Sequence, residues 1–255
     1  MRKITHILGN GCSYVKNGWT YGQDKVNFRE TDTFSQEPNS FPRMVGENLG
    51  ITADNIATAG TGIQFAIYST MLWIENNRDK VKNTLLLFGL TAFQRATFFT
   101  KAKYPDKFRF DGIPDKMPNH LTPNVHIPDP DNDKKTKEYW EARGFDPYEL
   151  RDFFTFYYKD AHHGEHWNKW IRMQLEMFQS YLIGIDMPHL FIDTLAYEED
   201  LSYLHSLFRF PDGYTCWKAY IKSYDPIYKE EHPNIHDHLV LSKHISKYCR
   251  NNYNI

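Results

Sequence analysis

The sequence has few cysteines, no long apolar run and no basic block, and each absence excludes a class of protein. Cys12, Cys216 and Cys249 are an odd number without paired spacing, which argues against a disulfide framework and favours either a reducing compartment or simple buried thiols. No stretch approaches about 18 consecutive apolar residues and no signal-peptide pattern is present, so we expect a soluble protein with no membrane partner. The net charge of −2 includes no cluster of Lys or Arg, so we expect no nucleic-acid partner.

The chain is long enough to form a large buried core, and it is rich in aromatic residues. A chain of 255 residues can bury roughly 70–75% of its unfolded surface, so it needs neither disulfides nor a structural metal to fold. We expect a single domain over residues 1–255. Aromatic residues make up 16% of the chain, and Tyr and Trp are residues that make good contact surfaces.

Short apolar runs alternate with segments of helical periodicity. Strands are expected at 4–8, 51–57, 85–90 and 189–193, and helices at 41–49 (capped by Ser40), 63–77, 167–182, 198–208 and 235–248. This alternation predicts an α/β sandwich with a mainly parallel sheet. We expect a loop at 16–39. Prolines rule out a long regular element across most of 93–164, which we interpret as an insertion with its own aromatic packing.

The stretch from His6 to Tyr14 carries the first chemical signal. A short apolar run ends at Gly9 and Gly11, whose backbones permit a sharp reversal, and Ser13 follows on the turn. A serine at the carboxyl edge of a sheet is one way to build a nucleophile site. The same residues also fit a tight strand-to-helix turn with Ser13 as the helix cap. Cys12 is an alternative nucleophile, although a buried thiol is the commoner fate of such a residue.

Three later segments converge on the same edge. Gly60 follows the second expected strand, and Thr91 follows the third. Carboxyl ends of parallel strands form one edge, where ligands usually bind. Glu230-Glu231-His232-Pro233 comes just before the last helix. A neighbouring carboxylate can orient the His232 imidazole, which could then take the proton from Ser13.

Together these blocks resemble the SGNH (GDSL) hydrolase family. Gly11-Cys12-Ser13 matches the family's serine block, with Cys12 where Asp is usual, and Asn55 to Gly60 matches the spacing of the second block. The third block, normally Gly-x-Asn-Asp, reads Gly89-Leu90-Thr91-Ala92, so the Asn is missing. The last block, normally Asp-x-x-His, has Lys229 in place of Asp, so Glu230 or Glu231 must substitute.

The resemblance implies a flavodoxin-like three-layer α/β/α sandwich and a serine ester hydrolase without cofactor or metal. Ser13 would attack the acyl carbonyl, His232 would act as base and then acid, and Glu230 would orient His232. The oxyanion would be held by the N–H groups of Ser13 and Gly60, with Thr91 in the place of the missing Asn.

The serine block, Phe93-Gln94-Arg95 after the third strand, and His232-Pro233 with His238 look similar to phage-encoded members. This implies an acylated substrate, such as O-acetyl groups on a host surface glycan, and a location in the host cytoplasm or the phage virion. We expect His238 to be a cap or core contact rather than a ligand.

Thr91 in place of Asn leaves an alternative open. Loss of one oxyanion donor typically costs about 10²–10³ in rate. The chain therefore also fits a member that has lost catalysis and serves as a virion structural or host-binding protein, with virion proteins as partners.

Two weak metal-binding patterns do not change the expectation that the protein binds no metal. Gly164 interrupts the pair His162 and His166. The alternating acids Asp129, Asp131 and Asp133 lack the Gly and Glu of a calcium loop.

Overall fold

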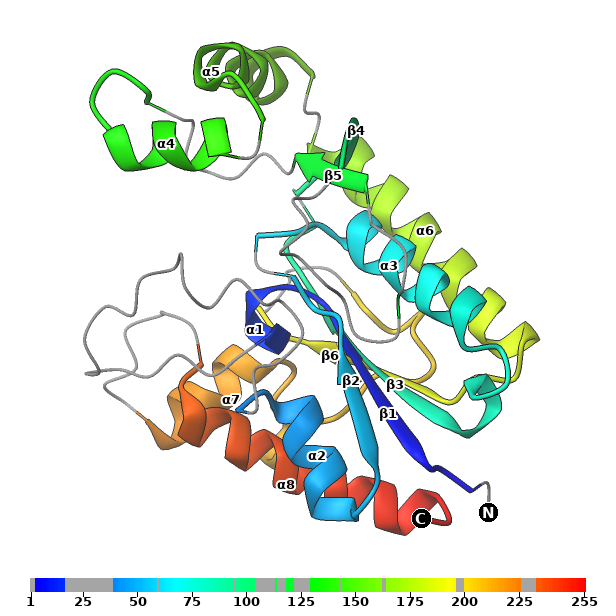
Figure 1. Ribbon diagram of the computed structural model, residues 1–255. Helices are drawn as coiled ribbons and strands as arrows, with labels where there is room; N and C mark the ends of the chain where they lie inside the picture. Colours follow the sequence, from blue (N-terminus) through cyan, green and yellow to red (C-terminus); the bar gives the residue numbers. More distant parts are fainter. Residues whose placement is uncertain are drawn as a thin grey trace.

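The computed structural model of the protein describes residues 3–16, 39–58, 60–93, 95–103, 113, 118–121, 129–142, 144–161, 164–195, 200–225 and 233–255. Figure 1 shows the arrangement of its helices and strands. In chain order they are β1 (His6–Asn10), α1 (Ser13–Lys16), α2 (Phe41–Leu49), β2 (Thr52–Asn55), α3 (Ile63–Asn76), a 3-10 helix (Val81–Asn83), β3 (Thr84–Leu90), β4 (Phe98–Lys103), β5 (Pro118–Leu121), α4 (Lys134–Ala142), α5 (Pro147–Phe156), a π-helix (Tyr157–Ala161), α6 (Gly164–Gly184), β6 (His189–Asp193), a 3-10 helix (Pro211–Gly213), α7 (Trp217–Tyr224) and α8 (Ile235–Asn252).

Four parallel strands form the main sheet, in the order β2-β1-β3-β6. Every residue of β1, β3 and β6 is buried. A parallel sheet with helices on both faces needs such continuous apolar strands, and the run at 84–90 provides the clearest one. The predicted α/β class with a parallel sheet is confirmed.

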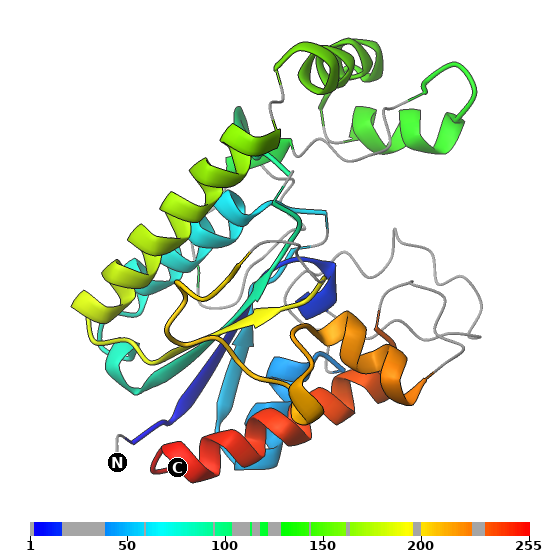
Figure 2. The ribbon, with the colours of Figure 1, turned by 180° about the vertical axis from the view of Figure 1, so that it is seen from behind.

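Helices cover both faces of this sheet. α3 and α6 lie on one face, and α2, α7 and α8 lie on the other (Figure 1, Figure 2). Alternate residues of β3 pack on opposite faces of the sheet, because successive side chains of a strand point in opposite directions. Leu86, Phe88 and Leu90 belong to the core under α3 and α6, while Leu85 and Leu87 belong to the core under α2 and α8.

The start of α2 depends on a residue almost two hundred positions away. Ser40 stands at the cap position but its side chain makes no capping hydrogen bond; instead the Phe41 N–H donates to Nδ1 of His238 at 2.9 Å. The His238 ring is fully buried and packs edge-on against Trp217 at 5.0 Å. The expectation that His238 is a cap or core contact is confirmed. The helix ends as predicted at Gly50, which adopts the left-handed conformation at φ 69°.

The helix expected at 198–208 is wrong over the part that the structure describes, residues 200–208. This segment turns and then pairs with the free edge of β6: the Phe191 N–H donates to Ser206 O at 2.9 Å, and the Phe208 N–H donates to Phe191 O at 2.8 Å. An unpaired strand edge offers backbone donors and acceptors that a neighbouring segment can satisfy. α7, which the sequence did not predict, follows this segment.

The range 93–164 contains regular structure of its own. β4 and β5 pair antiparallel, and α4 and α5 follow. α5 begins at Pro147, where the missing proline N–H costs nothing, and the Asp146 carboxylate accepts from the Tyr148 N–H at 2.7 Å. Residues 153–158, which the sequence left undecided between helix and strand, are helical. The interpretation of 93–164 as an insertion in one domain stays a prediction, and residues 17–38 of the expected loop lie outside the described residues.

None of the helices in the described ranges combines the length and the apolar character needed to cross a bilayer.

Asp54, on β2, is held in a small polar cluster at the side of the sheet. His6 Nε2 lies 3.1 Å from Asp54 Oδ2, and the Trp73 Nε1–H donates to the same oxygen at 2.9 Å. Burial by itself raises the pKa of Asp54, but hydrogen bonding by His6 and Trp73 and the charges of His6 and Lys80 outweigh burial. The pKa therefore lies below its ordinary value of 3.8.

A lowered pKa makes the ionised Asp54 a source of stability that acid removes. The contribution is present above the unfolded-state pKa near 3.8 and is lost as the pH falls through the lower folded-state pKa. We expect Asp54→Asn to lower the free energy of unfolding by about 1 kcal/mol at pH 7 and to have a smaller effect near pH 3. Urea unfolding across this pH range tests it, and an Asp54→Asn effect that does not shrink in acid contradicts it.

Candidate active site

The carboxyl ends of β1 and β3 mark the point where the chain changes direction across the sheet. From β1 the chain passes to β2 on one side, and from β2 it returns past β1 to β3 on the other side. Parallel α/β sheets bind ligands at such a point. The segments that leave β1, β2 and β3 here contain Ser13, Gly60 and Thr91, the residues singled out in the sequence.

Two glycines allow α1 to sit directly over the end of β3. A Cβ atom on Gly89 would lie 2.2 Å from Val15 Cγ2, and one on Gly11 would lie 2.7 Å from both Gly89 O and Val15 Cγ2. Gly11 also has φ 144°, a conformation that other residues rarely adopt. Val15 is fully buried in this position. The glycines therefore fix the turn from which Ser13 begins α1.

Asn10, the last residue of β1, anchors this turn to α3. Its buried Nδ2 donates to Ala66 O at 2.7 Å and lies 2.9 Å from Ser69 Oγ and 2.7 Å from Thr70 Oγ1. Its Oδ1 accepts from the Gly11 N–H at 2.7 Å. Asn10 was not selected from the sequence. The signal that could have found it is a single amide at the end of an otherwise apolar strand, at the edge where ligands bind.

We expect Asn10→Ala to lower the free energy of unfolding by about 2 kcal/mol, because it leaves the buried Gly11 N–H without its partner and removes the amide bonds to α3. Urea unfolding measures this. Asn48→Ala is the matched control, since the Asn48 side chain donates to Ser242 Oγ at 3.3 Å in a less buried place. Equal losses of stability in the two variants would contradict the anchoring role of Asn10.

The segment after β2 is tied to the turn after β1. Asn55 Nδ2 donates to the Val15 carbonyl at 3.2 Å, and the Thr58 N–H donates to the Gly11 carbonyl at 3.2 Å. The Thr61 hydroxyl lies 2.8 Å from Thr58 O. The segments 55–58 and 11–15, which are far apart in sequence, are therefore joined by hydrogen bonds.

Gly60 and Thr91 occupy different environments on this edge. Gly60 is partly exposed and has φ 73°, which favours glycine. The Thr91 side chain is fully buried, and its hydroxyl donates to Thr61 O at 3.2 Å. A hydroxyl has one proton to donate. An oxyanion role for Thr91 would therefore require this bond to be given up, and that role stays a prediction.

The pairing of Ser13 with His232 and Glu230 stays a prediction as well. His232, Glu230 and its alternative Glu231 lie outside the described residues, and for Ser13 the structure describes the backbone alone. The structure does describe Tyr14, which follows Ser13, and Pro233, which follows His232.

One buried ring contacts both Tyr14 and the start of α8. Trp217, at the start of α7, packs against Tyr14 at 6.3 Å and against His238 at 5.0 Å between ring centroids. Tyr14 follows Ser13 directly, and His238 lies in the first turns of α8, which begins shortly after His232. Both views show the start of α8 on the same side of the molecule as α1 (Figure 1, Figure 2).

The start of α8 is itself fixed by hydrogen bonds. The Asn234 side chain accepts from the Asp237 N–H at 3.1 Å, and Asp237 Oδ2 accepts from the Asn234 N–H at 2.8 Å. The Tyr224 hydroxyl donates to the other oxygen, Oδ1, at 2.9 Å. Burial raises the pKa of Asp237 despite these bonds. This capping box fixes the backbone immediately after Pro233.

A second acid, which was not selected from the sequence, lies on the same edge. Asp193 ends β6, is almost fully buried, and its Oδ1 accepts from the Leu195 N–H at 3.2 Å. The next residue, Thr194, donates its hydroxyl to the Leu90 carbonyl at 2.5 Å and joins the ends of β6 and β3. A carboxylate that follows a buried strand directly was the available signal.

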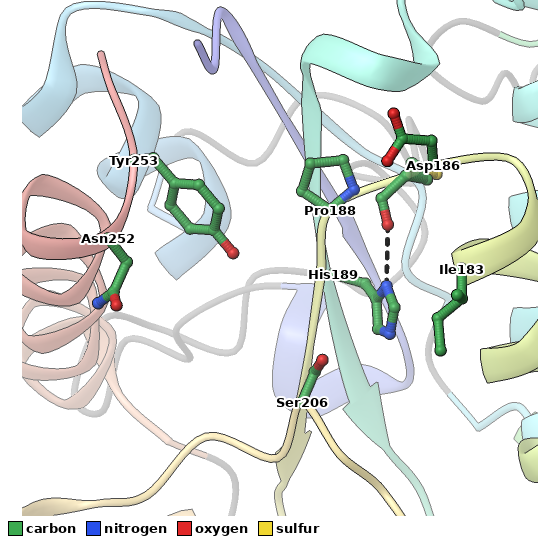
Figure 3. Close-up of a pocket in the computed structure, with 8 residues that line it drawn as sticks. Ile183, Asp186, Pro188, His189, Ser206, Asn252 and Tyr253 are labelled. Carbon is green, nitrogen blue, oxygen red and sulfur yellow. Dashed lines mark hydrogen bonds between the residues drawn. The ribbon is translucent and has the colours of Figure 1, made fainter. Parts of the chain in front are cut away.

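A pocket of about 400 Å³ lies elsewhere, beside the first residue of β6 (Figure 3). Its lining includes Asp186, His189, Ser206 and Tyr253. Nδ1 of His189 donates to the Met187 carbonyl at 2.9 Å, and burial lowers the pKa of His189, so its other nitrogen is an acceptor. Among the described residues that line the pocket, none is one of those predicted for catalysis.

Two acids of the calcium-like pattern bind other side chains of the protein. Asp129 accepts from the Asn132 amide at 2.9 Å, and Asp131 pairs with Arg151 at 3.0 Å. Of the histidine pair, His162 lies outside the described residues. Across the described ranges no three His, Cys, Asp or Glu side chains are grouped to hold a metal ion.

Comparison of the chain with models of protein families, with curated proteins and with solved structures finds no match. A function can therefore be inferred only from the chain's own residues, and above all from the edge of the sheet described above.

Proposed function

We propose that the protein is a serine ester hydrolase of the SGNH (GDSL) type, with Ser13 as nucleophile. The observation that carries the proposal is the Trp217 ring, which contacts both the residue after Ser13 and the first turns of the helix that follows His232. Two segments more than two hundred residues apart are thereby held at one edge of the sheet. The strand order supports the fold: numbered along the chain, the four strands stand 2-1-3-4, as in flavodoxin-like sheets.

The proposed reaction uses Ser13, His232, Glu230 and Gly60. His232 accepts the Ser13 proton as the Ser13 oxygen attacks the acyl carbonyl carbon. The N–H groups of Ser13 and Gly60 hold the resulting oxyanion. Collapse of the intermediate breaks the ester bond, and His232 returns the proton to the leaving alcohol. Water then cleaves the acyl-serine by the same steps, with Glu230 orienting His232 throughout.

The proposed substrate is an O-acetyl group on a host surface glycan, and the proposed setting is a phage virion or the cytoplasm of its host. Both rest on the resemblance of the Gly11-Cys12-Ser13 and His232-Pro233 blocks to phage-encoded members.

One observation favours the alternative, a virion structural or host-binding protein that has lost catalysis. The Thr91 hydroxyl, which stands where the family has its oxyanion-binding Asn, is buried and donates to the Thr61 carbonyl. Without that donor, an enzyme would be slower by about 10²–10³ than one with the full oxyanion site.

Hydrolysis of acetylated nitrophenol, followed by release of acetate from acetylated polysaccharide, tests the proposal. We expect turnover of both by the unaltered protein and a rate lower by at least about 10⁴ for Ser13→Ala. Folding of the variant is checked by its urea midpoint. Equal turnover by the two proteins would exclude Ser13 as the nucleophile, and no turnover by either protein on either substrate would end the esterase proposal and leave the non-catalytic alternative.

A further inference from the structure

The long helix α6 carries an apolar stripe on its outer side. Trp170, Met173, Met177 and Tyr181 are 47%, 43%, 65% and 36% exposed. Their spacings of three, four and four residues place them along one face of the helix. The opposite face, with Ile171, Leu175, Phe178 and Leu182, is buried against the sheet and α3. In both ribbon views α6 lies at the outside of the molecule (Figure 1, Figure 2).

A surface helix normally turns polar residues toward water on this face. α8, which covers the other side of the sheet, does so with charged and polar residues around the exposed Leu239. Four large apolar side chains in one row expose an area that ordinarily marks a contact site rather than a solvated surface.

The pattern of the stripe is that of a two-helix coiled coil. Trp170 and Met177 are one heptad apart, and Met173 lies between them, as the a and d positions of such a helix pair do. The residue before each a position flanks the seam. These flanking residues are Lys169 and Glu176, which have opposite charges. The Lys169 side chain is 69% exposed and the Glu176 side chain is 46% exposed.

The charges select one arrangement of two copies. When two α6 helices run antiparallel and Trp170 packs on the partner's Met173, Lys169 lies opposite the partner's Glu176, and the two-fold axis repeats the pair. A shift by one heptad, which would pack Met177 on the partner's Met173, brings Glu176 opposite the partner's Glu176. A parallel pair places the uncharged Gln174 opposite the partner's Lys169.

We propose that α6 is the interface of a homodimer in which two α6 helices pack antiparallel around Trp170 and Met173, with Lys169 paired to the partner's Glu176. The inference does not depend on the esterase proposal. A single helix pair buries less area than a standard interface, so we expect a dissociation constant of about 1–100 µM.

Sedimentation equilibrium of the full chain between about 1 and 300 µM tests the interface. We expect a monomer–dimer equilibrium for the unaltered protein and a monomer throughout for Trp170→Ser combined with Met173→Ser. Leu239→Ser is the control, because Leu239 is similarly exposed (36%) but lies on α8. A monomer at every concentration for the unaltered protein, or an equal effect of Leu239→Ser, overturns the proposal.

A charge exchange tests the arrangement of the two copies. Lys169→Glu and Glu176→Lys are each expected to weaken dimerisation roughly tenfold, since each creates two like-charge contacts across the interface. The double variant restores opposite charges and is expected to dimerise within about threefold of the unaltered protein. Both single variants also lose a bond within the helix, to Glu165 or Arg172, which their urea midpoints report. A double variant as weak as the singles rules out this antiparallel register.

Discussion

Replacing Ser13 or His232 by alanine is expected to lower kcat for ester hydrolysis by about 10⁴–10⁶, and replacing both is expected to lower it no further. The reason is that the proposed nucleophile and base act in one step. Without His232 the Ser13 proton has no acceptor, and without Ser13 the imidazole has no nucleophile to activate. Whatever rate remains after the first replacement comes from the oxyanion site and substrate binding, which the second leaves intact.

Steady-state kinetics on an acetyl ester measure the three variants against two controls. His236→Ala removes an exposed histidine from the first turn of α8, and Cys12→Ala removes the thiol beside Ser13. Both are expected to keep kcat within about tenfold of the unaltered protein. A double variant slower by the product of the two single effects would show that Ser13 and His232 act independently. Loss of activity in Cys12→Ala with Ser13→Ala still active would move the nucleophile to Cys12.

Gly89→Ala is expected to lower the free energy of unfolding by about 3 kcal/mol, the largest stability effect that we predict. A Cβ atom at this position would lie 2.2 Å from Val15 Cγ2 and 3.3 Å from Thr194 Cγ2. Val15 is fully buried, so it has no free space into which to move. Relief requires displacement of α1, and with it the turn that carries Ser13.

Urea unfolding of a double-variant cycle identifies Val15 as the source of the strain. In a Val15→Ala background the cost of Gly89→Ala is expected to fall below about 1 kcal/mol, because the clashing methyl group is gone. Gly184→Ala is the control, since a Cβ built there would meet no atom within 4 Å apart from its chain neighbours and the backbone of its own helix. If Gly89→Ala unfolds at the midpoint of the unaltered protein, or if its cost is the same in both backgrounds, the close packing of α1 on β3 is not what constrains this glycine.

The sequence alone determined the class of fold and most of its elements. The apolar run at 84–90 and the alternation of such runs with amphipathic segments predicted the four strands of the main sheet and α2, α3, α6 and α8, but not β4, β5 or α7. These features are local, because the spacing of apolar residues within a single segment decides which face of that segment is buried. The sharp reversal at Gly11 was likewise predicted from the sequence, and its φ is 144°.

Only the tertiary structure decided which polar groups meet. His238 caps a helix 197 positions earlier, and Asn10 binds α3 some 60 positions later. The segment after Asp200 pairs with the edge of β6 instead of coiling. In each case a buried N–H or carbonyl is satisfied by whichever partner packing brings near, and packing depends on the whole chain. Periodicity identifies what a segment buries, but not which distant donor or acceptor lies beside it.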